Sequence, residues 1–200
     1  MVGCGAHRME PVDPRAVGAL KPSIEDSDAG LVGIAPGFNL KAYRVIVVES
    51  FLVAPNEIKD EEDARLAKDM SAYLRARLVS RLRADGTFPE VTDGGIIAEP
   101  PAGAGVLLLQ GDISRLTEGS QALRYFVGFG AGATKAQIET RFVDGRSREV
   151  RMITADRRAA GMGIFGGDSR QFLTESMDQM AGGLVKFLHR VGSGGQPGQR

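Results

Sequence analysis

The chain has 200 residues, of which 42% are hydrophobic and 25% are charged, a composition typical of one globular domain with a substantial core. The 25 Lys and Arg residues balance the 25 Asp and Glu residues, so no net charge draws the protein toward nucleic acid or an anionic membrane surface. No apolar run approaches the roughly 18 residues that would predict a transmembrane helix.

Residues 1–40 carry scattered Pro and Gly and keep no period of 2 or 3.6 residues, so we predict a disordered tether or arm that contributes little to folding. The only cysteine is Cys4, which excludes an intramolecular disulfide. It follows Val2 and Gly3, as at the end of a bacterial lipoprotein signal, but that signal also needs a basic start and an apolar stretch. Two interpretations stay open: translation starts upstream of Met1, or Cys4 is an incidental residue of the arm.

Residues 41–190 are predicted to form a single domain, followed by a flexible tail over 191–200. A strand is expected over 42–50, because its β-branched run is apolar on both faces, as in the centre of a sheet. A long helix is expected over 60–85. Asp60 is a good N-cap, acidic residues follow it, and Gly86 is a good C-terminal stop. The apolar stripe of this helix repeats at spacings of three and four: Leu66, Met70, Tyr73, Leu74, Leu78 and Leu82.

A second central strand is predicted over 106–116. Residues 137–144 then alternate, which predicts a strand with one buried and one solvated face. The turn over 144–147, in which Gly145 is free to adopt positive φ, predicts a hairpin that returns as an antiparallel strand over 148–155. On the strand over 137–144, we expect Ile138, Thr140 and Phe142 to face the core and Gln137, Glu139 and Arg141 to face solvent.

A second long helix is predicted over 169–190. Its apolar residues recur every three or four positions, and Gly182 and Gly183 should weaken it by roughly 1 kcal/mol each relative to alanine. The order of elements predicts an α+β fold, with a single mostly antiparallel or mixed sheet and two long helices packed on one face. The core positions of this second helix are Leu173, Met177, Met180, Leu184 and Phe187.

The segment "GFGAG" over 128–132 raises the question of a dinucleotide site. Such a site needs a strand, a glycine turn and then a helix, so that the pyrophosphate meets the helix N-terminus. Here an alternating strand follows instead, and Thr134-Lys135 is the wrong order for a Walker loop. We interpret the glycines as the bend that begins a strand.

A second glycine-rich segment, 161–167, contains the pattern GxGxxG just before the last helix. No second strand follows to complete a βαβ unit, so a mobile loop is the favoured interpretation. Its Phe165 would form an exposed apolar tip or fold back onto the core. A nucleotide-binding protein or an enzyme that uses 128–132 or 161–167 remains the alternative.

The sequence suggests no catalytic, cofactor-binding or metal-binding residues. Its two histidines, His7 and His189, are far apart and lie in no cluster with metal-ligand spacing. A Cys4–His7 pair would lack the third and fourth ligands of a zinc site. We therefore predict a protein that is not an enzyme and uses no cofactor.

Four stretches, 45–51, 74–91, 107–132 and 139–150, resemble a bacterial family of envelope lipoproteins described as domain of unknown function 4410. The resemblance implies a lipid on Cys4, an outer-membrane location facing the periplasm, no enzymatic activity, and an unknown envelope protein as partner or a role in envelope assembly. The candidate structural or interaction residues are Arg124, Gly128, Gly130, Gly132 and Phe165, of which the first four form the most specific part of the resemblance.

Overall fold

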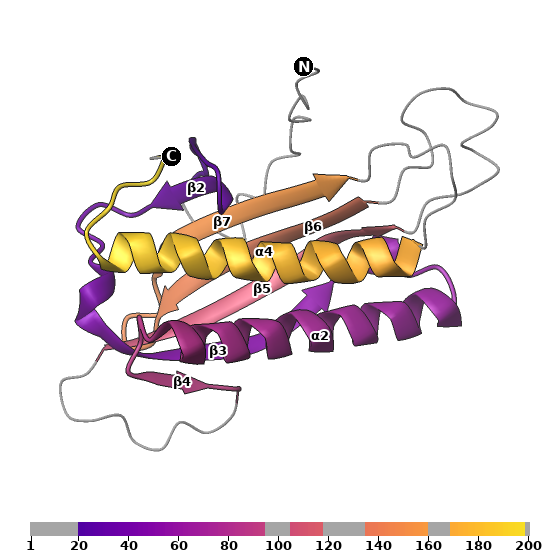
Figure 1. Cartoon of the computed structure of the whole chain (residues 1–200), viewed down its shortest axis with the longest axis horizontal. Helices are drawn as coiled ribbons and strands as arrows, with labels where there is room; N and C mark the ends of the chain where they lie inside the picture. The colour runs from indigo at the N-terminus through magenta and orange to yellow at the C-terminus, as the bar shows by residue number, and fades with distance from the viewer. Residues whose placement is uncertain (1–19, 95–104, 118–134, 160–168, 199–200) are drawn as a thin grey trace.

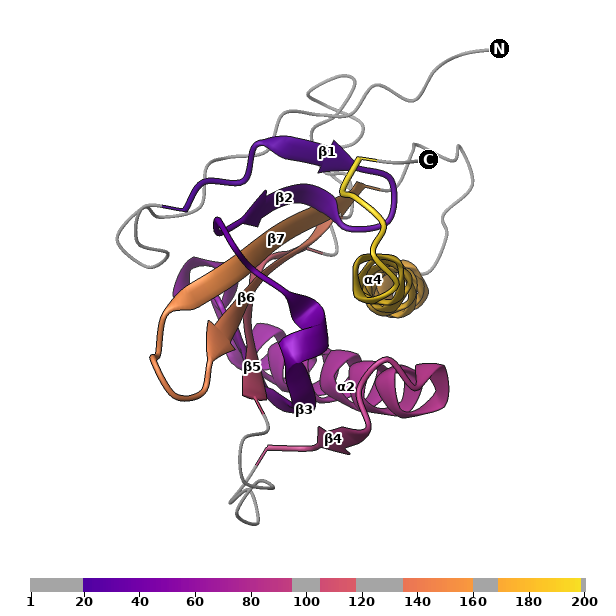
Figure 2. The same cartoon turned by 90° about the vertical axis from the view of Figure 1, so that its left-hand side faces the viewer.

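The computed structural model describes residues 20–94, 105–117, 135–159 and 169–198. These form one mixed sheet of seven strands, in the order β1-β2-β7-β6-β5-β3-β4, with both long helices on the same face (Figures 1 and 2). The α+β prediction is confirmed. The strands are β1 (Ile24–Asp26), β2 (Gly30–Ile34), β3 (Tyr43–Val53), β4 (Glu90–Thr92), β5 (Gly105–Thr117), β6 (Lys135–Asp144) and β7 (Val150–Ala159).

Strand β3 lies between the edge strand β4 and β5, and it pairs in parallel with both. Its residues Val45 to Val48 are all buried, as their apolar run on both faces predicted. The strand continues past the predicted end at Ser50 to Val53, because an irregularity between Val48 and Phe51 restores its pairing with β5. The remaining strand pairs are antiparallel.

Helix α2 spans Glu61–Asp85, with Asp60 as its N-cap. The Asp60 carboxylate accepts the amide hydrogens of Glu62 and Asp63, both at 2.9 Å, and Gly86 ends the helix in the left-handed conformation at φ 75°. Local signals thus fixed both ends. All the predicted stripe residues except the half-buried Tyr73 are buried in the main core between the helices and the sheet.

Helix α4 spans Ser169–Gly192 and runs parallel to α2 (Figure 1). Asp178 joins the two helices, because its carboxylate accepts hydrogen bonds from Arg77 and, at 2.7 Å, from Arg81. The five predicted core positions of α4 are all buried. Two short 3-10 helices, η1 (Leu40–Ala42) and η2 (Pro55–Glu57), flank β3.

The prediction of a disordered arm up to residue 40 is wrong for its second half. Residues 24–34 form the β1–β2 hairpin, and β2 extends the sheet by pairing with β7. Val32 is fully buried in the main core. Strands of three and five residues are too short to show a period, so no sequence pattern marked them. Residues 1–19 lie outside the described part of the chain.

The C-terminal segment also differs from the predicted flexible tail. The backbone amide of Gly195 donates to the carbonyl of Arg190 at 2.8 Å, and that of Gly198 donates to the Asp26 carboxylate at 2.9 Å. Residues 193–198 therefore turn back from α4 toward β1 (Figure 2). The glycine-rich composition indicated flexibility, and it could not show the contact with Asp26, which lies 172 positions earlier in the chain.

The predicted β6–β7 hairpin is present, but its turn differs from the expectation. Positive φ falls on Arg148, at 61°, and Gly145 is not among the residues with positive φ. Gly145 instead lets the turn lie close to Val106 of β5. Its amide donates to the Val106 carbonyl at 2.8 Å, and a Cβ atom at this position would lie 3.0 Å from the Cβ atom of Val106.

The buried and exposed faces of β6 follow the predicted alternation only in part. Ile138, Thr140 and Phe142 are fully buried toward the helices. On the other face, Gln137 is also buried, and Glu139 is half-buried. The second face is therefore less solvated than its polar residues indicated.

A titration of Tyr43 would test the contact that joins β3 to the β6–β7 turn. The Tyr43 hydroxyl donates to Asp144 at 2.8 Å, and burial together with this carboxylate raises the pKa of Tyr43 from 10.0 to about 12. Because the folded pKa is the higher one, the stabilisation is complete below about pH 10 and is lost as the pH rises through about 12. We expect a phenolate absorbance step near pH 12 that Tyr43→Phe removes. A wild-type titration without that step would contradict the contact.

Candidate functional site

The residues singled out from the sequence lie outside the described part of the chain. This holds for both glycine-rich segments, 128–132 and 161–167, and for the lipidation site. Lipidation, the strand bend and the apolar tip therefore stay predictions. The individual positions are Cys4, Arg124, Gly128, Gly130, Gly132 and Phe165.

The structure nevertheless shows where both glycine-rich segments join the domain. Thr117 pairs with Lys135, and Lys135 pairs with Ala159. Residues 118–134 and 160–168 are therefore attached at the same end of the sheet, where β5 and β7 end and β6 begins. Both long helices also begin at this end of the molecule (Figure 1). We call it the loop end: the last residues of β5 and β7 and the first residues of β6, α2 and α4.

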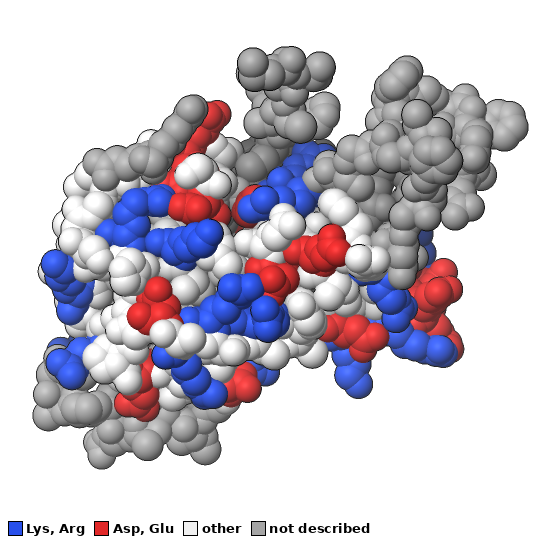
Figure 3. Space-filling model, viewed as in Figure 1, with Lys and Arg blue, Asp and Glu red and all other residues white. Residues whose placement is uncertain are grey.

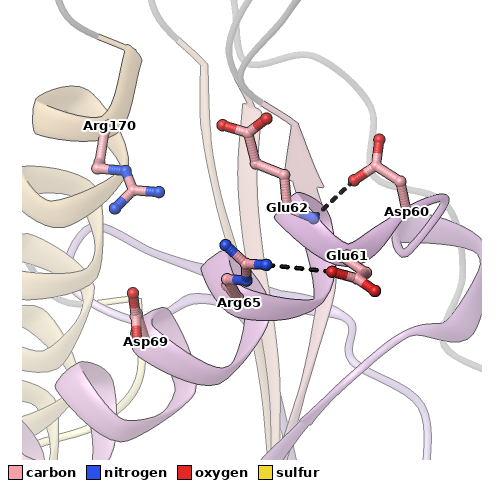
Figure 4. Close-up of a pocket in the computed structure, with 6 residues that line it drawn as sticks. All are labelled: Asp60, Glu61, Glu62, Arg65, Asp69 and Arg170. Carbon is pink, nitrogen blue, oxygen red and sulfur yellow. Dashed lines mark hydrogen bonds and ion pairs between the residues drawn. The ribbon is translucent and has the colours of Figure 1, made fainter.

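A recess of about 760 Å³ lies at the loop end, between the first turns of the two helices. In Figure 4, Arg65 lies beside Glu61, and Arg170 reaches toward α2 from α4. The full lining consists of Asp60, Glu61, Glu62, Arg65, Asp69 and Arg170.

The electrostatics of this recess do not favour a phosphate group. The Asp60 carboxylate already accepts two amides at the start of α2, and acidic neighbours satisfy the positive end of the helix dipole. Glu61 pairs with Arg65 at 3.1 Å, but their side chains are 91% and 75% exposed, so the pair contributes at most about 1 kcal/mol. Among the described residues, no group of three or more His, Cys, Asp or Glu could hold a metal ion.

Two buried carboxylates, Glu57 and Asp156, lie at the loop end. Glu57, in η2, accepts the backbone amide of Leu116 at 3.0 Å, which ties the chain entering α2 to the end of β5. Asp156, in β7, accepts from Arg158 at 3.0 Å. Burial raises the pKa of Asp156, and the arginine only partly offsets the effect. Neither buried carboxylate was predicted from the sequence. For Asp156, the one available signal was the alternation along β7, in which the even-numbered side chains face the core.

The sheet face away from the helices, which we call the open face, carries paired polar side chains. Gln110 donates to Glu49 at 3.0 Å, and Arg141 donates to Asp112 at 2.8 Å. Leu52, which pairs with Asp112 in register, is 67% exposed. A small apolar cluster lies beside these polar pairs, formed by Val45, Val47, Leu108 and Val143.

A second recess, of about 390 Å³, lies where the open face meets the β3–β4 edge. Its lining includes the apolar Val47 and Leu108, the basic Arg75 and Arg148, and the acidic Glu49. Arg75 is held by Asp93 at 2.6 Å. The recess thus combines apolar contact with polar groups of both signs, a composition suited to contact with another protein surface rather than to one small charged ligand.

The helix-covered side carries charges of both signs. In Figure 3, acidic and basic side chains are interspersed over the two helices, as on a solvated face. No helix within the described ranges is long and apolar enough to cross a bilayer.

Comparison with solved structures shows weak likenesses. A PelC dodecamer from Paraburkholderia phytofirmans is 15% identical, with 75% of this chain and 98% of that chain covered and a TM-score of 0.40. A Xanthomonas campestris protein of family DUF330 is 11% identical, with coverages of 86% and 95% and a TM-score of 0.43. A minor lipoprotein from Acinetobacter baumannii is 11% identical, with coverages of 76% and 94% and a TM-score of 0.39.

A sequence search of curated proteins finds no significant match. One family model does match, over residues 46–187. The matched region starts in β3 and ends in α4, so it contains the two helices and the sheet from β3 to β7. The chain therefore belongs to the family described as "Domain of unknown function (DUF4410)".

Proposed function

We propose that the protein is a lipid-anchored protein of the bacterial cell envelope, in the outer membrane and facing the periplasm, whose domain binds a protein partner and catalyses no reaction. The observation that carries this proposal is the position of the only cysteine. Cys4 follows a small residue and precedes β1 by about 20 residues, a length of chain that spans at most about 70 Å when extended.

The chemistry of Cys4 supports the anchor. A lone thiol in an oxidising compartment is prone to oxidation or to pairing with another chain. Diacylation converts the sulfur to a thioether and removes that liability. Each buried methylene contributes about 0.8 kcal/mol, so two or three acyl chains hold a protein stably where one does not. Because the formal net charge is zero, electrostatic attraction cannot replace the lipid.

The strand order of the sheet supports a binding role for the edge formed by β3 and β4. The arm leads into β1, at one edge, whereas β3 and β4 lie at the other. An anchor on the arm therefore leaves the second recess and the exposed Leu52 free. Exposed apolar groups ringed by polar ones are typical of protein contact surfaces.

The first test concerns the anchor. When the gene is expressed with its own upstream sequence, we expect the wild-type protein in the membrane fraction with added acyl mass, because Cys4 carries the lipid. Cys4→Ser should be soluble or retained as an uncleaved precursor. His7→Ser changes a polar residue of the same arm and should behave as the wild type. Fractionation and intact-mass spectrometry measure all three. Wild-type protein in the cytosol with a free thiol would rule the anchor out.

The binding surface is tested in the same cells. A photo-crosslinking residue at Leu52 should give a discrete adduct with one protein, whereas the same residue at the exposed Ser80 of α2 should not. Equal adducts at both positions would mean that the open face has no special role.

A further inference from the structure

The side chains of strand β1 bury a charged group and no large apolar one, whereas the apolar burial of the hairpin comes from Ala29 and Val32. The three residues of β1 are Ile24, which is 39% exposed, Glu25, which is exposed, and Asp26. The Asp26 side chain has no exposed surface. A strand whose only buried side chain is a carboxylate depends on the partners of that carboxylate, because a buried charge without partners is strongly destabilising.

Asp26 is fully supplied with donors. Although burial alone would raise the pKa of Asp26, its hydrogen bonds outweigh that effect and hold the pKa below its usual value. The carboxylate is therefore ionised. Its donors are the backbone amides of Asp28 at 3.0 Å, Ala29 at 3.2 Å and Gly198 at 2.9 Å, and Nη2 of Arg190 at 2.6 and 2.7 Å.

Arg190 gathers three parts of the chain around this carboxylate. It also donates to Asp28, in the β1–β2 turn, and its guanidinium lies 5.7 Å from the ring centre of Phe187. The last turns of α4, the hairpin turn and the returning C-terminal segment thus meet at one point beside β1 (Figure 2). We call the set Asp26, Asp28, Arg190 and Gly198 the clasp.

The clasp lies outside the region that the family shares. The family match covers residues 46–187, and all four clasp residues fall before or after it. The β1–β2 hairpin is also at the edge of the sheet, attached through the pairing of β2 with β7. Its removal would break no strand pair inside the matched region. The hairpin and the C-terminal segment therefore lie together outside the matched region, at one edge of the sheet.

We propose that the clasp is a strap: it holds the β1–β2 hairpin against β7, and the hairpin and residues 193–198 open together before the rest of the domain unfolds. Opening uncovers the edge of β7 from Met152 to Ala155, to which β2 is paired. If Cys4 is the membrane anchor, as proposed above, opening also lengthens the tether. The chain between Cys4 and the first fixed strand grows from about 20 to about 39 residues, so its maximum reach grows from about 70 to about 130 Å.

Hydrogen exchange followed by mass spectrometry on the full chain tests this inference without any lipid. Arg190→Gln removes the charge that pairs with Asp26. We expect the amides of residues 24–34 and 193–198 to exchange at least ten-fold faster, with the protection of β3 and β6 unchanged. Arg81→Gln is the matched control, because Arg81 is also a helical arginine paired with an aspartate, at 2.7 Å. It should leave the hairpin at its wild-type rate.

A second variant, Asp26→Asn, keeps the shape of the side chain and removes its charge, so it should give the same local acceleration. Equal acceleration in all strands would overturn the proposal, because the hairpin would then belong to the global folding unit. Unchanged exchange in the hairpin would overturn it as well. Neither result depends on whether Cys4 is acylated, so failure of the strap is distinguishable from failure of the anchor.

Discussion

Gly183→Ala is expected to destabilise the domain by about 1–3 kcal/mol, although alanine favours a helix over glycine by about 1 kcal/mol. A Cβ atom at Gly183 would overlap the backbone carbonyl oxygen of Asp28, in the β1–β2 turn. Because the obstacle is backbone rather than a flexible side chain, either α4 or the hairpin has to shift. Urea denaturation followed by circular dichroism would measure the change as a lower midpoint.

The adjacent glycine provides the control for this prediction. A Cβ atom at Gly182 would lie 3.5 Å from the Arg81 guanidinium carbon, an ordinary contact distance. Gly182→Ala should therefore raise the free energy of unfolding by up to about 1 kcal/mol, because alanine favours a helix over glycine, and the urea midpoint should rise with it. If the two substitutions had the same sign and size, the close approach of α4 to the hairpin turn would not exist.

Leu78→Ala should lower the free energy of unfolding by about 2–5 kcal/mol, the usual range for a fully buried leucine. Leu78 has no exposed surface and lies in the main core between α2 and the sheet. Its loss leaves a cavity as well as removing buried apolar area. Thermal and urea unfolding would both report the change.

Ser80→Ala is the matched substitution on the exposed side of the same helix. It removes no core contact and exchanges serine for a better helix former, so we expect no loss of stability. A loss below 1 kcal/mol for Leu78→Ala would mean that the packing of α2 on the sheet is looser than described.

Local interactions explain why α2 could be predicted almost to the residue. Its N-cap Asp60 and its C-terminal Gly86 act within one turn of the helix ends, and its stripe repeats with the helical period. The strands β3 and β6 were also predicted from patterns, of nine and eight residues, although β3 continues to Val53 and β6 begins at Lys135. Where a pattern is this long, any competing structure would expose the apolar residues to water, and the sequence alone is enough.

The positions of the two glycine-rich segments could be predicted only in part. Their place in chain order, before β6 and before α4, was readable from the strand and helix patterns. Both attach to the same end of the sheet, because Thr117 pairs with Lys135 and Lys135 pairs with Ala159. Such pairing depends on strand order and register, which no local pattern of one sequence encodes.

By itself, then, the sequence determined the fold class, the two long helices and the central strands, because these rest on periodic burial and on capping within a few residues. Only the tertiary structure decided that residues 20–40 and 193–198 are ordered parts of the domain. The two segments meet at one ionised carboxylate, Asp26, whose donors Arg190 and Gly198 are more than 160 positions away. A contact of that kind has no local signature, since each residue alone resembles an ordinary charged or flexible surface position and gains its role only when the chain brings the three together.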